Sequence, residues 1–167
     1  ADAYARLTGT CGVALVTGGQ GHTNAVGGLP TALAGEVPVL LLSGHAPLGE
    51  VGMGAFQELD NAALAAPVAK HSSIASSPAA IAGELATAMR AARSGRPGPV
   101  HLSLPTDVLD AKLDPDGVAW PGAADFAPLA MPLAPEAAGS LRGLIAHAEC
   151  PLVLAPPALC TPAGRAG

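Results

Sequence analysis

Positive charge and aromatic side chains are both scarce in this sequence of 167 residues. Eight Lys and Arg residues stand against thirteen Asp and Glu residues, which gives a formal net charge of −5, and only 2% of the residues are aromatic. The basic residues form no cluster of the kind that nucleic-acid binding requires. Half of the residues are hydrophobic, yet Gly, Pro or polar residues interrupt every apolar run well before the roughly 20 residues of a membrane span. We therefore expect no nucleic-acid partner, no membrane partner, and an interior rich in alanine.

Cysteine is scarce as well. Cys11, Cys150 and Cys160 are odd in number and share no spacing typical of a disulfide or a metal site. We interpret them as small buried hydrophobic residues of a protein in a reducing compartment. The first residues, Ala1 to Arg6, are typical of a helix rather than of a basic segment that leads into an apolar one. They predict no signal peptide, and the expected location is cytoplasmic.

The most informative segment of the sequence is rich in glycine. A short apolar run, Val13 to Val16, leads directly into the turn TGGQGHTN, Thr17 to Asn24, and then into a stretch of small residues. This pattern predicts a strand, a glycine turn and the start of a helix, an arrangement that lets the main chain approach a ligand closely. The turn is therefore the main candidate for a cofactor site.

Two other interpretations of this turn were weighed. A dinucleotide site would place a third glycine where Asn24 stands, and it would place an acidic residue at the end of the next strand. That strand ends instead in Ser43-Gly44-His45. The sequence thus disfavours a dinucleotide, whereas a plain tight turn without a ligand stays open.

Beyond the turn, buried apolar runs alternate with helical patterns along the chain. Continuous runs of Val and Leu are typical of strands covered on both faces, as in parallel sheets. The sequence predicts an α/β fold in which helices flank an open parallel sheet. The expected strands are 12–17, 37–43 and 99–104, and the expected helices are 1–8, 22–35 and 78–93, the last capped by Ser77.

The character of the chain changes after residue 110. Residues 111–134 are rich in Pro and Gly and predict a linker between domains. A helix at 136–148 and a strand at 151–155 would then begin a second α/β unit, which occupies residues 135–167 and is incomplete. The first domain is expected to span residues 1–110.

Six motifs along residues 1–110 carry a resemblance to a known family. Their order and spacing resemble the N-terminal, pyrimidine-binding domain of thiamine diphosphate (ThDP) enzymes, and in particular that of acetolactate synthase (acetohydroxyacid synthase) large subunits. The six segments are Thr17–Ala25, Pro38–Gly44, Gly54–Asp60, Pro67–His71, Gly95–Val100 and Pro105–Val108.

The resemblance implies a cofactor shared between subunits. In this family ThDP lies between the first domain of one subunit and the last domain of its partner, so the implied assembly is a homodimer or a homotetramer. The last domain holds Mg²⁺ and the diphosphate, and the substrate is a 2-keto acid that loses CO2 before its remainder joins a second carbonyl. Such a carboligase is classed as a transferase or a lyase. Whether the protein also binds FAD stays open, because no motif in the sequence indicates an FAD site.

The resemblance also implies roles for individual residues. Phe56 and Gln57 match an aromatic-amide pair at the active-site mouth, and Lys70 matches a substrate-channel position. The turn residues that match the cofactor border are Thr17, Gly18, Gly19, Gly21 and Asn24.

Each of these roles has a structural alternative. The structural alternative for Asn24 is that its side-chain amide braces the turn or the start of the helix. The structural alternative for Phe56 is that its ring packs in the core. Lys70 and His71 follow a segment that we interpret as an apolar strand. The alternative to a substrate-channel role is that they are solvated residues at the end of that strand.

The histidines were weighed as general bases. His22 and His45 lie in loops expected near the cofactor, so each is a candidate, although no paired carboxylate is in view. His101 and His147 are interpreted as ordinary packing or surface residues. No cluster of His, Cys, Asp or Glu predicts a metal site in this chain.

The chain also departs from the family. The family has an activating glutamate just upstream of the segment that matches Ala1, and it has a diphosphate-binding domain; neither is present in these 167 residues. We therefore expect a fragment of a ThDP-dependent carboligase, truncated at both ends and inactive alone. The alternatives are part of a ThDP-dependent decarboxylase or lyase, and a non-catalytic module derived from this domain.

Overall fold

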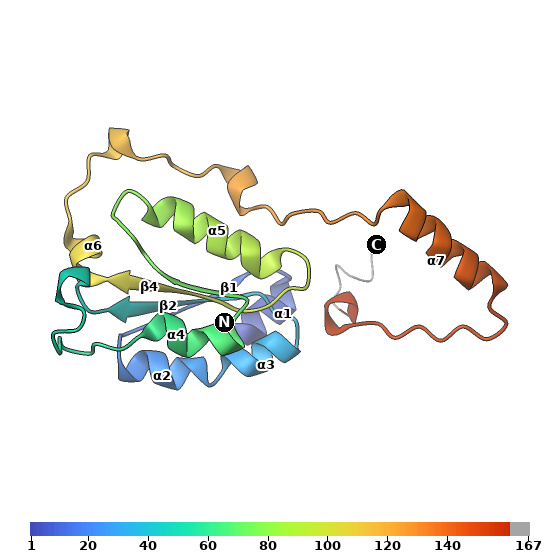
Figure 1. Ribbon diagram of the computed structural model, residues 1–167, viewed down its shortest axis with the longest axis horizontal. Coiled ribbons are helices and arrows are strands. Elements are labelled where there is room, and N and C mark those ends of the chain that lie inside the picture. The colour runs from blue at the N-terminus through green and yellow to red at the C-terminus, as the bar shows by residue number, and fades with distance from the viewer. Residues whose placement is uncertain (161–167) are drawn as a thin grey trace.

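A four-stranded parallel sheet forms the centre of the protein, with helices on both of its faces (Figure 1). The computed structural model describes residues 1–160. The strands are β1 (Gly12–Val16), β2 (Val39–His45), β3 (His71–Ile74) and β4 (Val100–Pro105), in the spatial order β1-β2-β4-β3. The expected α/β fold with an open parallel sheet is confirmed.

The core lies on both faces of strand β2. Leu40 packs with Leu102 of β4 against the alanines of one helix, whereas Leu41 packs with Leu29 and Ala65 on the opposite face. Successive side chains of a strand point to opposite faces. A run of leucines is therefore buried throughout, as the sequence predicts for a sheet covered on both sides.

Seven α-helices accompany the sheet within the described residues. Helix α5 covers one face of the sheet, and α2, α3 and α4 cover the other (Figure 1). Their bounds are α1 (Asp2–Thr8), α2 (Gln20–Val26), α3 (Leu29–Ala34), α4 (Asn61–Ala65), α5 (Ile81–Arg93), α6 (Thr106–Asp110) and α7 (Pro135–His147).

Two helix predictions need correction. The helix expected over 22–35 is divided into α2 and α3 at Gly27 and Gly28, because adjacent glycines weaken a helix and Pro30 favours a new first turn. Helix α5 begins at Ile81 rather than at residue 78, and it has no side-chain cap. Ser77 instead accepts a turn hydrogen bond at its carbonyl from the N–H of Ala80, at 3.1 Å.

The strand β3 was not predicted. The apolar segment before it, interpreted as a strand, forms α4 and a 3-10 turn at Ala66–Val68. Lys70 and His71 therefore stand at the beginning of a strand rather than at the end of one. The sequence of β3, HSSI, is too polar for the apolar pattern that identifies the other three strands.

Residues 111–134 form an extended segment with 3-10 turns at Pro115–Gly117 and Ala123–Phe126, and helix α7 follows it (Figure 1). Residues 151–155 are exposed and form no strand, so that expectation was wrong: a strand needs a partner for its main-chain groups, and no described strand lies beside it.

Cys11 is buried, but Cys150 and Cys160 are exposed, which corrects their interpretation as buried residues. No helix among the described residues is both long and apolar enough to cross a membrane.

Candidate functional site

A cleft of about 340 Å³ opens where β1 and β2 end. The turn after β1, the end of β2 and the loop before α4 form most of its walls. Ligands of open parallel sheets bind outside the carboxyl ends of the strands, which is where this cleft lies. Its lining includes Thr17, Gly18, Gly44, His45, Phe56 and Gln57.

The glycine turn is packed too closely to accept side chains. A β-carbon on Gly18 would lie 2.8 Å from the carbonyl oxygen of Gly44, a distance that real β-carbons do not show. Gly19 has φ +59°, and a β-carbon there would lie 3.1 Å from Cβ of Gln57. The two glycines thus let one wall of the cleft pack directly against the other.

Gln57 stands in a strained main-chain conformation. Its φ is +59°, in the left-handed region that costs a residue with a side chain about 1–2 kcal/mol. Its Oε1 accepts a hydrogen bond of 3.3 Å from Oγ1 of Thr17. Strain of this kind persists where the surrounding structure enforces it, and it occurs often at binding sites.

Glu58 organises the loop that carries Phe56 and Gln57. Its carboxylate accepts hydrogen bonds from the main-chain N–H groups of Gly52 at 2.5 Å, Gly54 at 2.9 Å and Ala55 at 2.9 Å. These donors, that of Gly52 first, hold the pKa of the Glu58 carboxyl below its usual value. An ionised carboxylate therefore closes the loop around the cleft.

Phe56 lies at the rim of this cleft. Its side chain is 86% exposed, so the alternative that it packs in the core was wrong. An exposed aromatic ring at the mouth of a cleft can cover a bound molecule without contributing to the core.

Three of the five predicted turn residues, Gly19, Gly21 and Asn24, do not line the cleft. Gly21 lies on α2, where a β-carbon would meet Cγ2 of Thr17 at 2.7 Å, so this glycine allows the helix to pack on the turn. Asn24 is exposed on α2 and makes no side-chain hydrogen bond to any described residue. The interpretation that its amide braces the turn was therefore wrong.

Lys70 is far from these residues along the strands. It precedes β3, at the amino-terminal edge of the sheet, and its Nζ donates to the carbonyl oxygens of Ala91 at 2.5 Å and Ser94 at 2.7 Å. Partial burial lowers the pKa of the Lys70 amine. The structure thus places Lys70 at the end of α5 and not in the cleft, while His71 is exposed at the start of β3.

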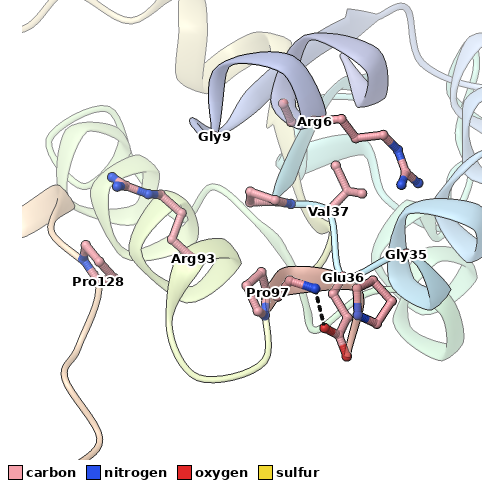
Figure 2. A pocket seen from close by; sticks show the side chains of 12 residues that line it. Arg6, Gly9, Gly35, Glu36, Val37, Arg93, Pro97 and Pro128 are labelled. Carbon is pink, nitrogen blue, oxygen red and sulfur yellow. Dashed lines mark hydrogen bonds between the residues drawn. The ribbon is translucent and has the colours of Figure 1, made fainter. Parts of the chain in front are cut away.

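A second cavity, of about 230 Å³, lies at this amino-terminal edge (Figure 2). Two of its charged residues already have partners: Arg6 pairs with Asp2, and Glu36 accepts hydrogen bonds from Arg96 and from the main-chain N–H of Ala158, the dashed line in Figure 2. None of the sequence-predicted site residues lines it. The carboxyl-edge cleft is therefore the candidate site.

Beneath the cleft lies a buried polar network that the sequence analysis missed. His101 on β4 is fully buried, with Nδ1 2.8 Å from the hydroxyl of Ser72 and Nε2 2.8 Å from that of Ser43. The Ser72 hydroxyl donates to the carbonyl of Ala62, so it accepts from Nδ1–H of His101. His101 is thus a buried packing residue, as one of the two predicted alternatives has it, but its ring also connects the strands by hydrogen bonds. The signal was present, since polar residues interrupt strands that are otherwise apolar.

The network reaches the cleft wall through Asn61. Its side-chain amide Nδ2 donates to the carbonyl of Gly44 at 3.0 Å and lies 3.4 Å from Oγ of Ser43. Gly44 is the residue against which Gly18 packs. Asn61 thereby orients the main chain that supports the glycine turn.

His22 is part of this buried region and not of a loop. It lies on α2 with no exposed surface, its ring centroid is 4.6 Å from that of His101, and neither ring nitrogen has a hydrogen-bond partner among the described residues. Burial lowers the pKa of His22 and lowers that of His101 to about 3. Both rings are therefore neutral, and His22 cannot serve as a base in the cleft.

The remaining expectations concern His147 and metals. His147 is exposed at the end of α7, as predicted for a surface residue. Within residues 1–160, no three His, Cys, Asp or Glu side chains are grouped so that they could hold a metal ion.

Most of the residues that line this cleft lie in a segment that matches a known family model. Residues 1–64 match the family model "Thiamine pyrophosphate enzyme, N-terminal TPP binding domain". The segment includes the glycine turn, the end of β2, Phe56 and Gln57.

Curated relatives match beyond that segment. An acetolactate synthase of Arthrospira platensis is 45% identical over 114 residues, which cover 68% of this chain and 20% of that protein. A probable acetolactate synthase large subunit of Methanocaldococcus jannaschii is 39% identical over 160 residues, 93% of this chain and 27% of that protein. The acetolactate synthase isozyme 3 large subunit of Escherichia coli is 44% identical over 110 residues, 66% and 19% respectively. The chain thus spans between 19% and 27% of the length of these relatives.

Proposed function

We propose that the chain is part of a ThDP-dependent carboligase of the acetolactate synthase type, on the premise that residues 1–64 match the N-terminal TPP-binding domain of thiamine pyrophosphate enzymes. The chain contributes the side of the site that receives the aminopyrimidine ring. The observation that carries the proposal is the glycine turn packed against Gly44 and Gln57 at the carboxyl edge of the sheet, within the segment that the family model matches.

The residues of the cleft fit such a ring. A volume of about 340 Å³ accommodates one aromatic heterocycle, and known small-molecule sites begin at about this size. Gly18 leaves main-chain atoms uncovered at the wall, while Pro47 and Phe56 offer apolar surface. The hydroxyl of Thr17 and the amide of Gln57 are the polar groups that would orient the ring.

These side chains have distinct tasks in the proposed reaction. When bound, ThDP supplies the carbanion chemistry of 2-keto acid decarboxylation and of the following carbon–carbon bond formation. The Gln57 amide donates a hydrogen bond to a substrate carboxylate or carbonyl without changing its own charge. Phe56, at the rim, covers the substrate and shapes the space that admits the second carbonyl compound.

Other parts of the site belong to the proposal as well. The diphosphate and Mg²⁺ would be held by residues outside this chain, in an assembly of two or four like subunits located in the cytoplasm. Residues 1–110 would form the pyrimidine domain, residues 111–134 a linker, and residues 135–167 the start of a central domain. The packing of the glycine turn and the length of the relatives support this arrangement.

The test uses the polypeptide that contains this chain in its natural length. With ThDP, Mg²⁺ and pyruvate, it is expected to release CO2 and to form acetolactate, while Gly18→Val loses ThDP binding. Release of CO2 with acetaldehyde as the product would favour a decarboxylase instead. Absence of ThDP binding at millimolar concentration would overturn the proposal and favour a non-catalytic module.

A further inference from the structure

We propose that His45 is the residue of the cleft that exchanges a proton with the bound substrate, through its Nε2 atom. The inference rests on the proposed function, because it assigns a role within that same site. His45 is the last residue of β2, so it stands at the carboxyl edge of the sheet directly after Gly44. His45 lines the candidate cleft and also a neighbouring one that contains Glu58 and Asp60.

The hydrogen bonds of His45 determine which nitrogen is free. Nδ1 lies 2.7 Å from the carbonyl oxygen of Ala46, which can only accept, so Nδ1 carries the proton that it donates. In the neutral ring the lone pair is then on Nε2. Nε2 makes no hydrogen bond to a described residue and is not among the fully buried polar atoms, unlike both ring nitrogens of His22. The side chain is 6% exposed, so most of the ring is held rigidly while this atom stays accessible.

The other side chains of the cleft cannot perform this task. The Thr17 hydroxyl and the Gln57 amide do not change their protonation near neutral pH, and Glu50 is an exposed carboxylate. Histidine is the side chain whose ordinary range of titration includes neutral pH. His45 is therefore the group of this cleft suited to both giving and taking a proton.

An ionised carboxylate lies near His45. Three main-chain donors keep Glu58 ionised, and His45 lies near enough to lower the pKa of the Glu58 carboxyl. The buried rings of His22 and His101 would repel a positive charge on His45 only if they were protonated themselves, and burial keeps both of them neutral. The titratable groups of the surrounding elements are Glu50 after β2, Glu58 and Asp60 before α4, His22 on α2, His101 on β4 and Asp107 on α6.

The proton transfer balances without a further reactant. In the proposed carboligation, ThDP when bound would supply the carbon nucleophile that forms a carbon–carbon bond with the carbonyl carbon of the acceptor. The π electron pair of the carbonyl moves to its oxygen. That oxygen takes the Nε2 proton of the imidazolium and becomes a hydroxyl, which leaves His45 neutral. His45 regains its proton from the solvent, which supplies the one proton that decarboxylation and carboligation of two 2-keto acid anions consume.

The first test needs no activity. In the 167-residue chain, ¹⁵N-resolved NMR spectra of the histidine rings are recorded over pH, with and without sodium pyruvate. His45 is expected to show the Nδ1–H tautomer, and pyruvate is expected to move the midpoint of its titration to higher pH, because a nearby carboxylate favours the cation. His71, exposed at the opposite edge of the sheet, serves as the internal control and should not respond.

The outcomes separate this inference from the proposed function. If pyruvate perturbs the side-chain amide of Gln57 and not His45, the role of His45 is overturned while the proposed function stands. If it perturbs neither, the role of His45 is overturned, and the proposed function is decided separately by the acetolactate assay on the polypeptide of natural length. An Nε2–H tautomer would also overturn the role of His45.

The second test uses the active protein of natural length. His45→Gln keeps a polar side chain but cannot carry a proton, so kcat should fall by about 10²–10⁴-fold with little change in KM. The alkaline limb of the pH–rate profile, along which the proton donor is lost, should disappear. His71→Gln should leave both constants unchanged. A His45→Gln variant that folds and retains kcat would overturn the inference, and the NMR test decides the matter if that variant fails to fold.

Discussion

Oγ1 of Thr17 donates a hydrogen bond of 3.3 Å to Oε1 of Gln57, which joins two residues forty positions apart in the sequence. Thr17 ends the segment that leads out of β1, and Gln57 belongs to the loop before α4. The contact brings the two halves of the cleft together. It exists because Gly18 and Gly19 have no side chains that would hold the two segments apart.

The first prediction concerns Gly19. Gly19→Ala should lower the free energy of unfolding by about 1–2 kcal/mol, because alanine disfavours φ +59° and its Cβ would press on Gln57. Urea denaturation measures the change. Gly49→Ala is the matched control, since a β-carbon there meets no atom within 4 Å. Equal stability of the Gly19→Ala variant and the native chain would show that the turn does not need this conformation.

The second prediction separates strain from function at Gln57. Gln57→Gly should be more stable than Gln57→Ala by roughly 1 kcal/mol, because glycine adopts φ +59° without a steric cost. In the active protein both variants should lose about 5- to 150-fold in kcat/KM, since each removes the same polar group. ThDP affinity should change little.

Steady-state kinetics and urea denaturation together test this prediction. Unchanged kinetics with every 2-keto acid tried would remove Gln57 from the active-site mouth. A Gln57→Gly variant less stable than Gln57→Ala would contradict the assignment of strain.

The third prediction concerns Lys70. Lys70→Met should lower the melting temperature, with a loss of about 1–2 kcal/mol, because two carbonyls at the end of α5 lose a charged donor. Lys112→Met, at an exposed position, is the control. The KM for the 2-keto acid should not change in the active protein. A raised KM at unchanged stability would instead support the substrate-channel role.

The fourth prediction is a loss of stability in mild acid. The pKa of His101 in the folded protein is about 3, below its ordinary value of 6.5, and that of His22 is lowered too. The unfolded chain therefore binds protons that the folded protein excludes as the pH falls below about 6.5. The free energy of unfolding should fall by up to about 1.4 kcal/mol per pH unit for each such histidine, and it should be level above about pH 7.5.

Urea denaturation between about pH 5 and pH 7.5 measures this slope. His22→Leu should flatten it, because that ring has no hydrogen bond to lose. A slope that is the same in the native chain and in His22→Leu would show that His22 is protonated in the folded state.

Several features were predictable because they depend on residues close together in the chain. The run Val39 to Leu42 predicts a strand covered on both faces, and the turn after β1 predicts a site at the edge of the sheet. The residues Thr17, Gly18, Phe56 and Gln57 do line one cleft. Their order in the sequence was sufficient to recognise the family segment that contains them.

Other features depend on contacts between distant residues. The division between α2 and α3, the polar strand β3 and the position of Lys70 at the end of α5 follow from packing that no local periodicity reports. The same holds for His101, whose role depends on Ser43 and Ser72 on neighbouring strands.

The pattern of apolar residues, glycine and proline was enough to establish a parallel α/β sheet and the turn at its edge, because strands and turns reflect the preferences of adjacent residues. The tertiary structure alone decided which histidine is buried and which is accessible. His22 and His45 look equivalent in the sequence, yet both ring nitrogens of His22 are fully buried, whereas His45 lines the cleft at the end of β2, because burial depends on which elements pack over a residue.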